Sequence, residues 1–425
     1  MPRARSIPSL TGVRGIAALW VFTTHFYGLA ADMLHMPWLL HSLFLFNGFR
    51  GVDLFFVLSG FILMHVHEAQ FRVPTWRVIR DFFIVRFFRV YPLNTVVLLA
   101  IVPLVLFAPS YVAMQRAYTD PAFAYRAHNL SWPGFVQTLL LVQSWTVLKL
   151  GEWNIVSWTL SAEVLGYILF PMLAMLAMRI TSVRSAVALC AASLAALVVI
   201  LFAAHHANNN PTGTFGAIRM FFCFTAGVVL YRVYHLAPDS TERYAAAITL
   251  GAVGFIAATL FFPVVPVCDV FGFTALVFGL AYQRGVVNAL LASAPVVWLG
   301  RISFSFYLTH YLIIGILAWC MGPWLRQLDR GPSFLCRIME ADRATHGGGT
   351  RREPGRGCAA RAAWRAAAGE HPVGPGRVLC GHDRFRGAGG AAYRPPPAGR
   401  GPPFLPAGQH AGGRAGHVAL IHRGA

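Results

Sequence analysis

Long apolar runs, separated by short polar stretches, recur along the first three quarters of the chain. Each holds roughly 20 residues, the length that an α-helix needs to cross about 30 Å of hydrocarbon. The pattern predicts an all-α fold, a polytopic transmembrane bundle of about nine to ten helices. The predicted spans are residues 11–31, 44–66, 92–109, 157–178, 184–204, 216–235, 244–263, 267–284 and 303–324. A shorter apolar run at 134–149 either crosses the membrane or re-enters from one side.

The arginines between the runs indicate the membrane topology, because cytoplasmic loops carry an excess of basic residues. With a cytoplasmic N-terminus, the basic connection 71–89 is cytoplasmic as well. If 134–149 does not cross, the later basic connections face the same side. These connections hold Arg179 with Arg184, Arg232 with Arg243, and Arg284 with Arg301. We therefore expect nine spans, with residue 325 on the outer side.

Composition supports a membrane protein, since 56% of the residues are hydrophobic and only 12% are charged, against about a quarter charged in soluble proteins. The net charge of +19 comes from arginines that follow the loops, so we expect a lipid bilayer and no nucleic acid as partner. The seven cysteines form no CxxC pair. Neither a metal site nor a disulfide framework is predicted.

The last part of the chain has a different character. Residues 331–425 are rich in Arg, Gly, Ala and Pro, and they show neither helical nor strand periodicity. We divide the chain into a membrane domain at 1–330 and this tail. Two interpretations of the tail stay open: a disordered basic segment, or a stretch translated out of frame after a shift near residues 325–345.

Two polar residues in the first span are candidate functional residues. Arg14 and His25 are eleven positions apart, so they share one stripe of the helix, about 16 Å apart along its axis. Arg14 is alternatively a membrane anchor, and His25 alternatively a hydrogen-bonded interior residue. An imidazole titrates near neutral pH and can take a proton from a hydroxyl.

Further ionisable residues lie at the ends of the next two predicted spans. Arg50 and Asp53 are three positions apart and could pair on one helix face. Arg86 and Arg89, one turn apart at the inner edge of the third span, are either membrane anchors or a pair that grips a phosphate-bearing ligand.

The later spans add a second group of candidates. Glu163 lies inside the fourth span beside Trp158 and Ser161, and an intramembrane carboxylate indicates function by default. Tyr307 and His310 follow Arg301 in the last span. The predicted membrane topology places His25, Asp53 and Glu163 in the outer half of the membrane. It places the basic group near the cytoplasmic side: Arg14, Arg86, Arg89, Arg301 and His310. An anionic donor would then enter from the cytoplasm, with the chemistry deeper in the membrane.

Five segments together resemble the acyltransferase 3 family of membrane O-acyltransferases. They are LTGVRGIAALWVFTTHF, GVDLFFVLSGFIL, RFFRVYPL, WTLSAEVLGYILFP and ISFSFYLTHYLII, in the order of the family and covering most of residues 8–315. The resemblance implies about ten membrane helices in the bacterial cytoplasmic membrane. It also implies transfer of an acyl group from acyl-CoA, commonly acetyl-CoA, to a hydroxyl of a surface carbohydrate or glycolipid.

The family motifs also fall on particular residues of this chain. The essential Arg…His pattern falls on Arg14 and His25, the paired arginines on Arg86 and Arg89, and the Ser/Glu motif on Ser161 and Glu163. We hypothesise that His25 is the general base, oriented by Glu163 or Asp53. The three arginines would bind the phosphates of the donor. Trp158, Ser161, Tyr307 and His310 complete the predicted site.

Two alternatives remain at this stage. A transporter or flippase would use the same intramembrane ionisable groups for proton relay. An inactive truncated member of the family is the other, because family members usually carry one more apolar helix after the last motif, where this chain has its Arg/Gly/Pro-rich tail.

Overall fold

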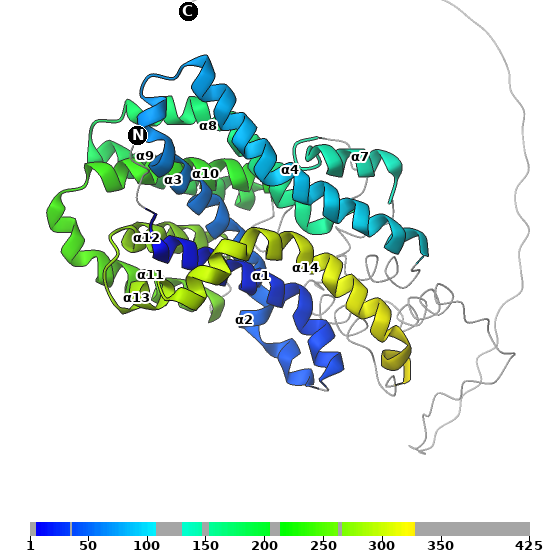
Figure 1. Ribbon diagram of the computed structural model, residues 1–425. Coiled ribbons are helices and arrows are strands. Elements are labelled where there is room, and N and C mark those ends of the chain that lie inside the picture. The colour runs from blue at the N-terminus through cyan, green and yellow to red at the C-terminus, as the bar shows by residue number, and fades with distance from the viewer. Residues whose placement is uncertain are drawn as a thin grey trace, which may run out of the picture. The chain divides into compact units, whose positions relative to one another are not determined.

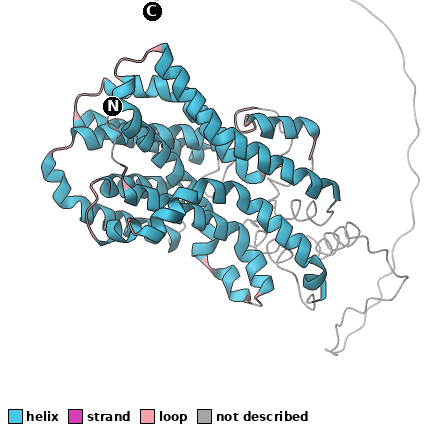
Figure 2. Cartoon of the chain, in the orientation of Figure 1, coloured by secondary structure: helices cyan, strands magenta, loops and turns pink. Residues whose placement is uncertain are grey.

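The computed structural model describes residues 6–34, 36–107, 130–146, 153–204, 213–261 and 266–327. The chain divides into two compact units, Met1–His371 and Pro372–Ala425, and all described residues belong to the first. Every regular element among the described residues is a helix (Figure 2), which confirms the all-α prediction for them. The tail lies outside the described residues, so the division at residue 330 and both interpretations of the tail stay predictions.

Twelve α-helices are described, together with five short 3₁₀ helices (Figure 1). The α-helices are α1 (Pro8–Met33), α2 (Leu43–Phe46), α3 (Gly51–Phe71), α4 (Trp76–Phe107), α7 (Trp132–Leu140), α8 (Trp158–Met178), α9 (Val183–Ala203), α10 (Gly213–Leu236), α11 (Ala245–Phe261), α12 (Asp269–Ala281), α13 (Val286–Leu291) and α14 (Ala294–Gln327). The 3₁₀ helices are η1 (Pro37–His41), η2 (Asn47–Arg50), η3 (Ile155–Ser157), η4 (Asp239–Tyr244) and η5 (Pro266–Cys268).

Seven helical segments of the described chain are long and apolar enough to cross a membrane, so the protein is an integral, multi-pass membrane protein. They are Leu43–Phe71, Trp76–Phe107, Ile155–Met178, Val183–Ala203, Gly213–Leu236, Asp239–Phe261 and Ala294–Leu317. The other two predicted spans correspond to α1 and α12. Helix α1 has 26 residues but is not among the seven, since its polar residues lower its hydropathy. Helix α12 has only 13 residues, about 20 Å of helix.

Two predicted boundaries are wrong in ways that matter for the site. Helix α4 begins at Trp76 instead of residue 92, because arginine is a good helix former and the basic connection continues the helix. Helix α14 begins at Ala294 instead of residue 303. The run at 134–149 forms α7, whose nine residues, about 14 Å, are too short to span the hydrocarbon; its last three residues are outside the described chain.

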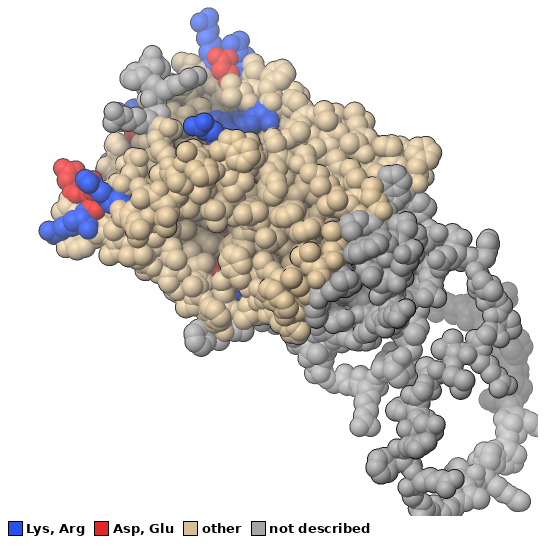
Figure 3. Space-filling view, turned by 60° about the horizontal axis from the view of Figure 1, so that its bottom comes forward, with Lys and Arg blue, Asp and Glu red and all other residues tan. Residues whose placement is uncertain are grey.

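The charged side chains are arranged as a bilayer requires. In Figure 3, Arg, Asp and Glu gather mainly in small groups at the upper and left margins of the face shown, and most of the remaining described surface on this face is uncharged. Many large apolar side chains are exposed on the described part of the protein, among them Phe88, Leu99 and Ile168. Apolar side chains exposed in this way suit contact with lipid tails.

Glycines allow two pairs of helices to pack with their backbones in direct contact. Helix α1 runs beside α14 (Figure 1), and a Cβ atom on Gly300 would lie 1.9 Å from the carbonyl oxygen of Thr11. Helix α3 packs on α10, where a Cβ atom on Gly60 would lie 2.1 Å from the carbonyl oxygen of Phe224. Small residues at such crossings are typical of membrane helices, whose association depends on close packing.

The packing of α3 on α10 leads to a stability prediction. Gly60→Ala should destabilise the protein by about 1–3 kcal/mol, because the new methyl group overlaps backbone that cannot move aside. Gly254→Ala in α11 is the matched control, since nothing lies within 4 Å of that position. Thermal unfolding in detergent should show a lower midpoint for the first variant alone. Equal midpoints for the two variants would contradict the packing described here.

Candidate active site

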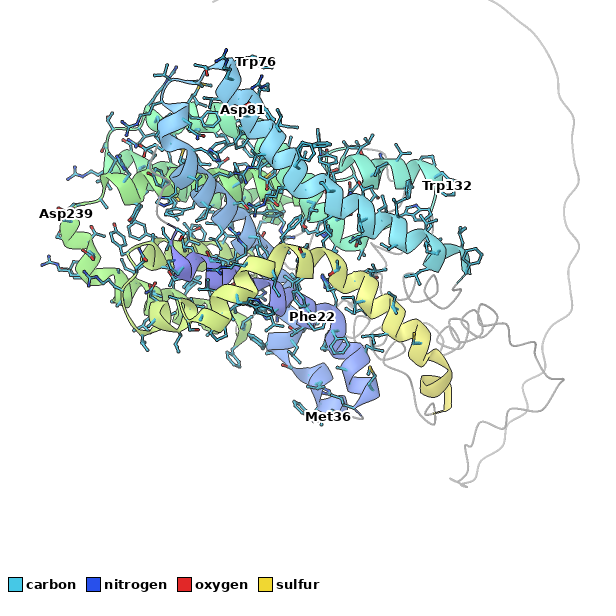
Figure 4. All side chains as sticks on the ribbon, in the orientation of Figure 1. Phe22, Met36, Trp76, Asp81, Trp132 and Asp239 are labelled. Atoms are coloured by element: carbon cyan, nitrogen blue, oxygen red, sulfur yellow. The ribbon has the colours of Figure 1, made fainter. Side chains whose placement is uncertain are left out.

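A pair of histidines joins α1 to α14. The Nδ1 atom of His25 lies 3.0 Å from the carbonyl oxygen of Val21 and 3.2 Å from Nε2 of His310. The side chain of His310 is buried, with 1% of it exposed, and its Nδ1 faces the carbonyl oxygen of Tyr307. The ring of Phe22, labelled in Figure 4 on α1, meets the His310 ring edge-on. We call His25 and His310 the histidine pair.

The depth expected for His310 is wrong. The two helices run parallel, because Gly15 lies against Gly300 and, ten residues further along both helices, His25 lies against His310. His310 is therefore at the level of His25, about 15 Å along the helices from the Gly15–Gly300 contact. The sequence prediction placed His310 near the cytoplasmic side because it began the last span nine residues too late.

Three arginines and one carboxylate form a second group. Arg14 of α1, Arg86 and Arg89 of α4, and Glu163 of α8 are close enough to interact electrostatically. We call Arg14, Arg86 and Arg89 the arginine cluster. Arg14 is half-buried, and Arg89 is exposed. Among the described residues, neither of these two makes a hydrogen bond or an ion pair.

Arg86 is held most firmly of the three arginines. Its guanidinium lies over the rings of Phe82 and Tyr167, 5.5 and 5.7 Å from their centres. Its Nη2 is 3.0 Å from Nε2 of His67. Its Nε atom is buried without a hydrogen-bond partner among the described residues. Buried donors without a hydrogen-bond partner are rare in proteins.

Glu163 lies near the arginine cluster and not near the histidine pair. Its Oε1 accepts hydrogen bonds from the hydroxyls of Tyr167 (2.5 Å) and Ser59 (3.0 Å). Thr159, one turn earlier on α8, donates to the hydroxyl of Tyr307 near the histidine pair. The expectation that Glu163 orients His25 is therefore wrong, because the helix carries its carboxylate one turn toward the arginines.

Asp53 does not orient His25 either. Its carboxylate accepts hydrogen bonds from Nε and Nη2 of Arg219 at 3.1 and 2.8 Å, and both side chains are buried. The predicted pair of Arg50 with Asp53 is also wrong. Arg50 binds Asp269 of α12 at 2.6 Å. Arg50 ends the 3₁₀ helix η2 and Asp53 lies in the first turn of α3, so the regular spacing of one helix does not apply to them.

Trp158 and Ser161 support the site from α8. The Arg219 guanidinium lies 5.9 Å from the centre of a Trp158 ring, which places Trp158 over the buried ion pair. The hydroxyl oxygen of Ser161 accepts hydrogen bonds from the backbone N–H of Ser144 and the indole N–H of Trp145, both at 3.0 Å. Ser161 therefore anchors the loop that follows α7.

Three residues near the candidate site are not predicted from the sequence: Arg219, Tyr167 and His67. Arg219 is an arginine inside a predicted span, and that alone marks a candidate. Tyr167 is four residues after Glu163, the spacing of neighbours on a helix face. His67 had no sequence signal, because its contact with Arg86 follows from the continuation of α4 through the basic connection.

Helix α1 thus connects two chemically different groups. Arg14 belongs to the arginine cluster and His25 to the histidine pair, with about 16 Å of helix axis between them. The cluster carries a net charge of about +2 with Glu163 included, by formal charge, which suits an anionic ligand. The histidine pair holds an imidazole that can exchange protons.

Comparison with known proteins identifies the class. Residues 7–336 match the acyltransferase 3 family, described as an acyltransferase domain. The chain belongs to this family and is a membrane O-acyltransferase. Family membership therefore favours the enzyme over the transporter alternative.

Individual relatives are distant. Acyltransferase MdmB of Streptomyces mycarofaciens is 30% identical over 338 residues, which is 74% of this chain and 80% of MdmB. "Putative peptidoglycan O-acetyltransferase YrhL" of Bacillus subtilis is 26% identical over 73% of this chain, which spans about half (49%) of that relative. Peptidoglycan O-acetyltransferase OatA of Listeria monocytogenes is 27% identical over 30% of this chain and 19% of its own length. No solved structure matches.

The Asp53–Arg219 ion pair leads to a prediction that distinguishes a structural role of Asp53 from a catalytic one. Asp53→Leu and Arg219→Met should each destabilise the protein by about 3–5 kcal/mol, because each removes the ion-pair partner of a buried charge. The double variant should regain most of the lost stability, since two apolar side chains can replace a buried pair. Thermal unfolding in detergent measures this. A stable, well-folded Asp53→Leu protein without transferase activity would instead indicate a catalytic role for Asp53.

Proposed function

We propose that the protein transfers an acyl group, most simply acetyl, from acyl-CoA to a hydroxyl of a carbohydrate or glycolipid at the bacterial cell surface. The observation that carries the proposal is the placement of Arg14 and His25 by one helix: Arg14 in the arginine cluster and His25 in the histidine pair. An anion-binding group and a proton acceptor are what this reaction needs from the protein.

The arginine cluster is the proposed donor site. Guanidinium groups bind phosphate oxygens through paired, charge-assisted hydrogen bonds, and coenzyme A carries several phosphates. The buried Nε of Arg86 and the exposed side chain of Arg89 are donors that such oxygens can use. With the N-terminus in the cytoplasm of a bacterium, the cluster lies on the cytoplasmic side of the histidine pair, where acyl-CoA is available.

His25 is the proposed general base. It takes the proton of the acceptor hydroxyl while the hydroxyl oxygen attacks the thioester carbonyl carbon of the donor. The carbon–sulfur bond then breaks, and the coenzyme A thiolate takes the proton back from the His25 imidazolium. The products are the O-acyl ester and free coenzyme A. The pantetheine arm would carry the thioester from the arginine cluster to His25.

The class of acceptor rests on the relatives. OatA is named for O-acetylation of peptidoglycan, a polysaccharide outside the membrane. A hydroxyl of this kind would reach the histidine pair from the outer side, opposite the proposed donor entrance. We therefore propose a surface carbohydrate or glycolipid as the acceptor.

Replacement of His25 tests the proposed base. His25→Asn should reduce the rate of acyl transfer by about 10²–10⁴-fold, the usual contribution of a general base, and leave the protein folded in the membrane. The assay follows labelled acetyl groups from acetyl-CoA into cell-surface glycans in isolated membranes. A rate near that of the wild type would refute the role.

Replacement of Arg89 tests the donor site. Arg89→Gln should raise the KM for acetyl-CoA about 10–100-fold, since a charge-assisted hydrogen bond contributes about 1.5–3 kcal/mol. It should leave the unfolding midpoint unchanged, because Arg89 is exposed. Arg77→Gln is the matched control: Arg77 is another exposed arginine of α4, outside the cluster. Equal effects of the two substitutions on KM would contradict the assignment.

A further inference from the structure

The hydrogen bonds of the histidine pair determine which ring nitrogen of each histidine carries the hydrogen. A backbone carbonyl oxygen only accepts hydrogen bonds, so a ring nitrogen that faces it carries a hydrogen. Nδ1 of His310 faces the carbonyl oxygen of Tyr307. In the neutral ring the hydrogen is therefore on Nδ1, and Nε2 of His310 is an acceptor.

The same reasoning extends to His25. Its Nδ1 lies 3.0 Å from the carbonyl oxygen of Val21 and 3.2 Å from Nε2 of His310. Both neighbours are acceptors, so Nδ1 of His25 carries the hydrogen and shares it between them. In the neutral ring the lone pair is consequently on Nε2, the nitrogen at the far side of the ring.

We propose that His310 is a positioning residue, whose Nε2 accepts the Nδ1 hydrogen of His25 and so holds the His25 ring with its Nε2 ready to take the proton of the acceptor hydroxyl. This inference rests on the proposed function, since it assigns a role to the neighbour of the proposed base. His310 thereby takes the orienting role predicted from the sequence for Glu163 or Asp53, whose carboxylates bind other partners.

The surroundings of His310 suit such a role. Its ring is 1% exposed and is enclosed by the rings of Phe22, Phe306 and Tyr307. The close contact of Gly15 with Gly300 fixes the register of the two helices. When His25 takes a proton, its Nδ1 hydrogen remains directed at two acceptors, which stabilise the imidazolium that forms.

Three substitutions separate this role from simple packing. His310→Gln keeps an acceptor oxygen near the position of Nε2, His310→Asn keeps only a donor toward the Tyr307 carbonyl, and His310→Leu keeps neither. We expect the Gln variant to retain kcat within about tenfold of the wild type. The Asn and Leu variants should lose about 100-fold or more in kcat, the usual cost of a misplaced reacting group, at an unchanged KM for acetyl-CoA.

The outcomes distinguish this inference from the proposed function. An unchanged KM shows that each variant is folded and binds the donor. Equal losses in all three variants, or no loss in the Leu variant, would overturn the role of His310. An active His25→Asn enzyme would instead overturn the proposed base. As an independent readout, ¹⁵N NMR of histidine-labelled protein in lipid nanodiscs should show a protonated Nδ1 and a bare Nε2 for His25, and the opposite tautomer would overturn the inference.

Discussion

A charged or hydrogen-bonding side chain in the hydrocarbon must find its partner within the protein, because no water is available there. The described helices meet this constraint with contacts between elements. Asp53 of α3 binds Arg219 of α10, and Glu163 of α8 accepts a hydrogen bond from Ser59 of α3. The ionisable groups therefore hold the bundle together as well as forming its proposed site.

Helix α1 organises the rest of the site. Its glycines bring the backbone of α14 into contact, and this parallel packing sets His25 against His310. Three turns earlier, the same helix places Arg14 beside Arg86 and Arg89 of α4. The helix between Arg14 and His25 keeps the arginine cluster and the histidine pair about 16 Å apart along its axis. In the proposed mechanism, an extended donor binds at the arginine cluster and reacts at the histidine pair.

Hydropathy and the family motifs predict most of the helices and most of the residues that the structure brings together. They do not predict the contacts. Asp53 has Arg50 as its helical neighbour, yet its partner is 166 residues away. Glu163 is predicted at the level of His25, yet it lies with the arginines, because its position depends on how α8 packs. The depth of His310 depends on where α14 begins, and a sequence indicates helix ends less well than helix centres. Long-range packing decides these features.

The central claim is that donor binding and proton transfer are separate functions at the two ends of α1. Calorimetric titration of the purified His25→Asn protein with acetyl-CoA tests it most directly, together with the transfer rate of the same sample. The account predicts that acetyl-CoA binds with the dissociation constant of the wild type although transfer is lost. Loss of donor binding together with transfer, or full transfer without His25, would contradict it.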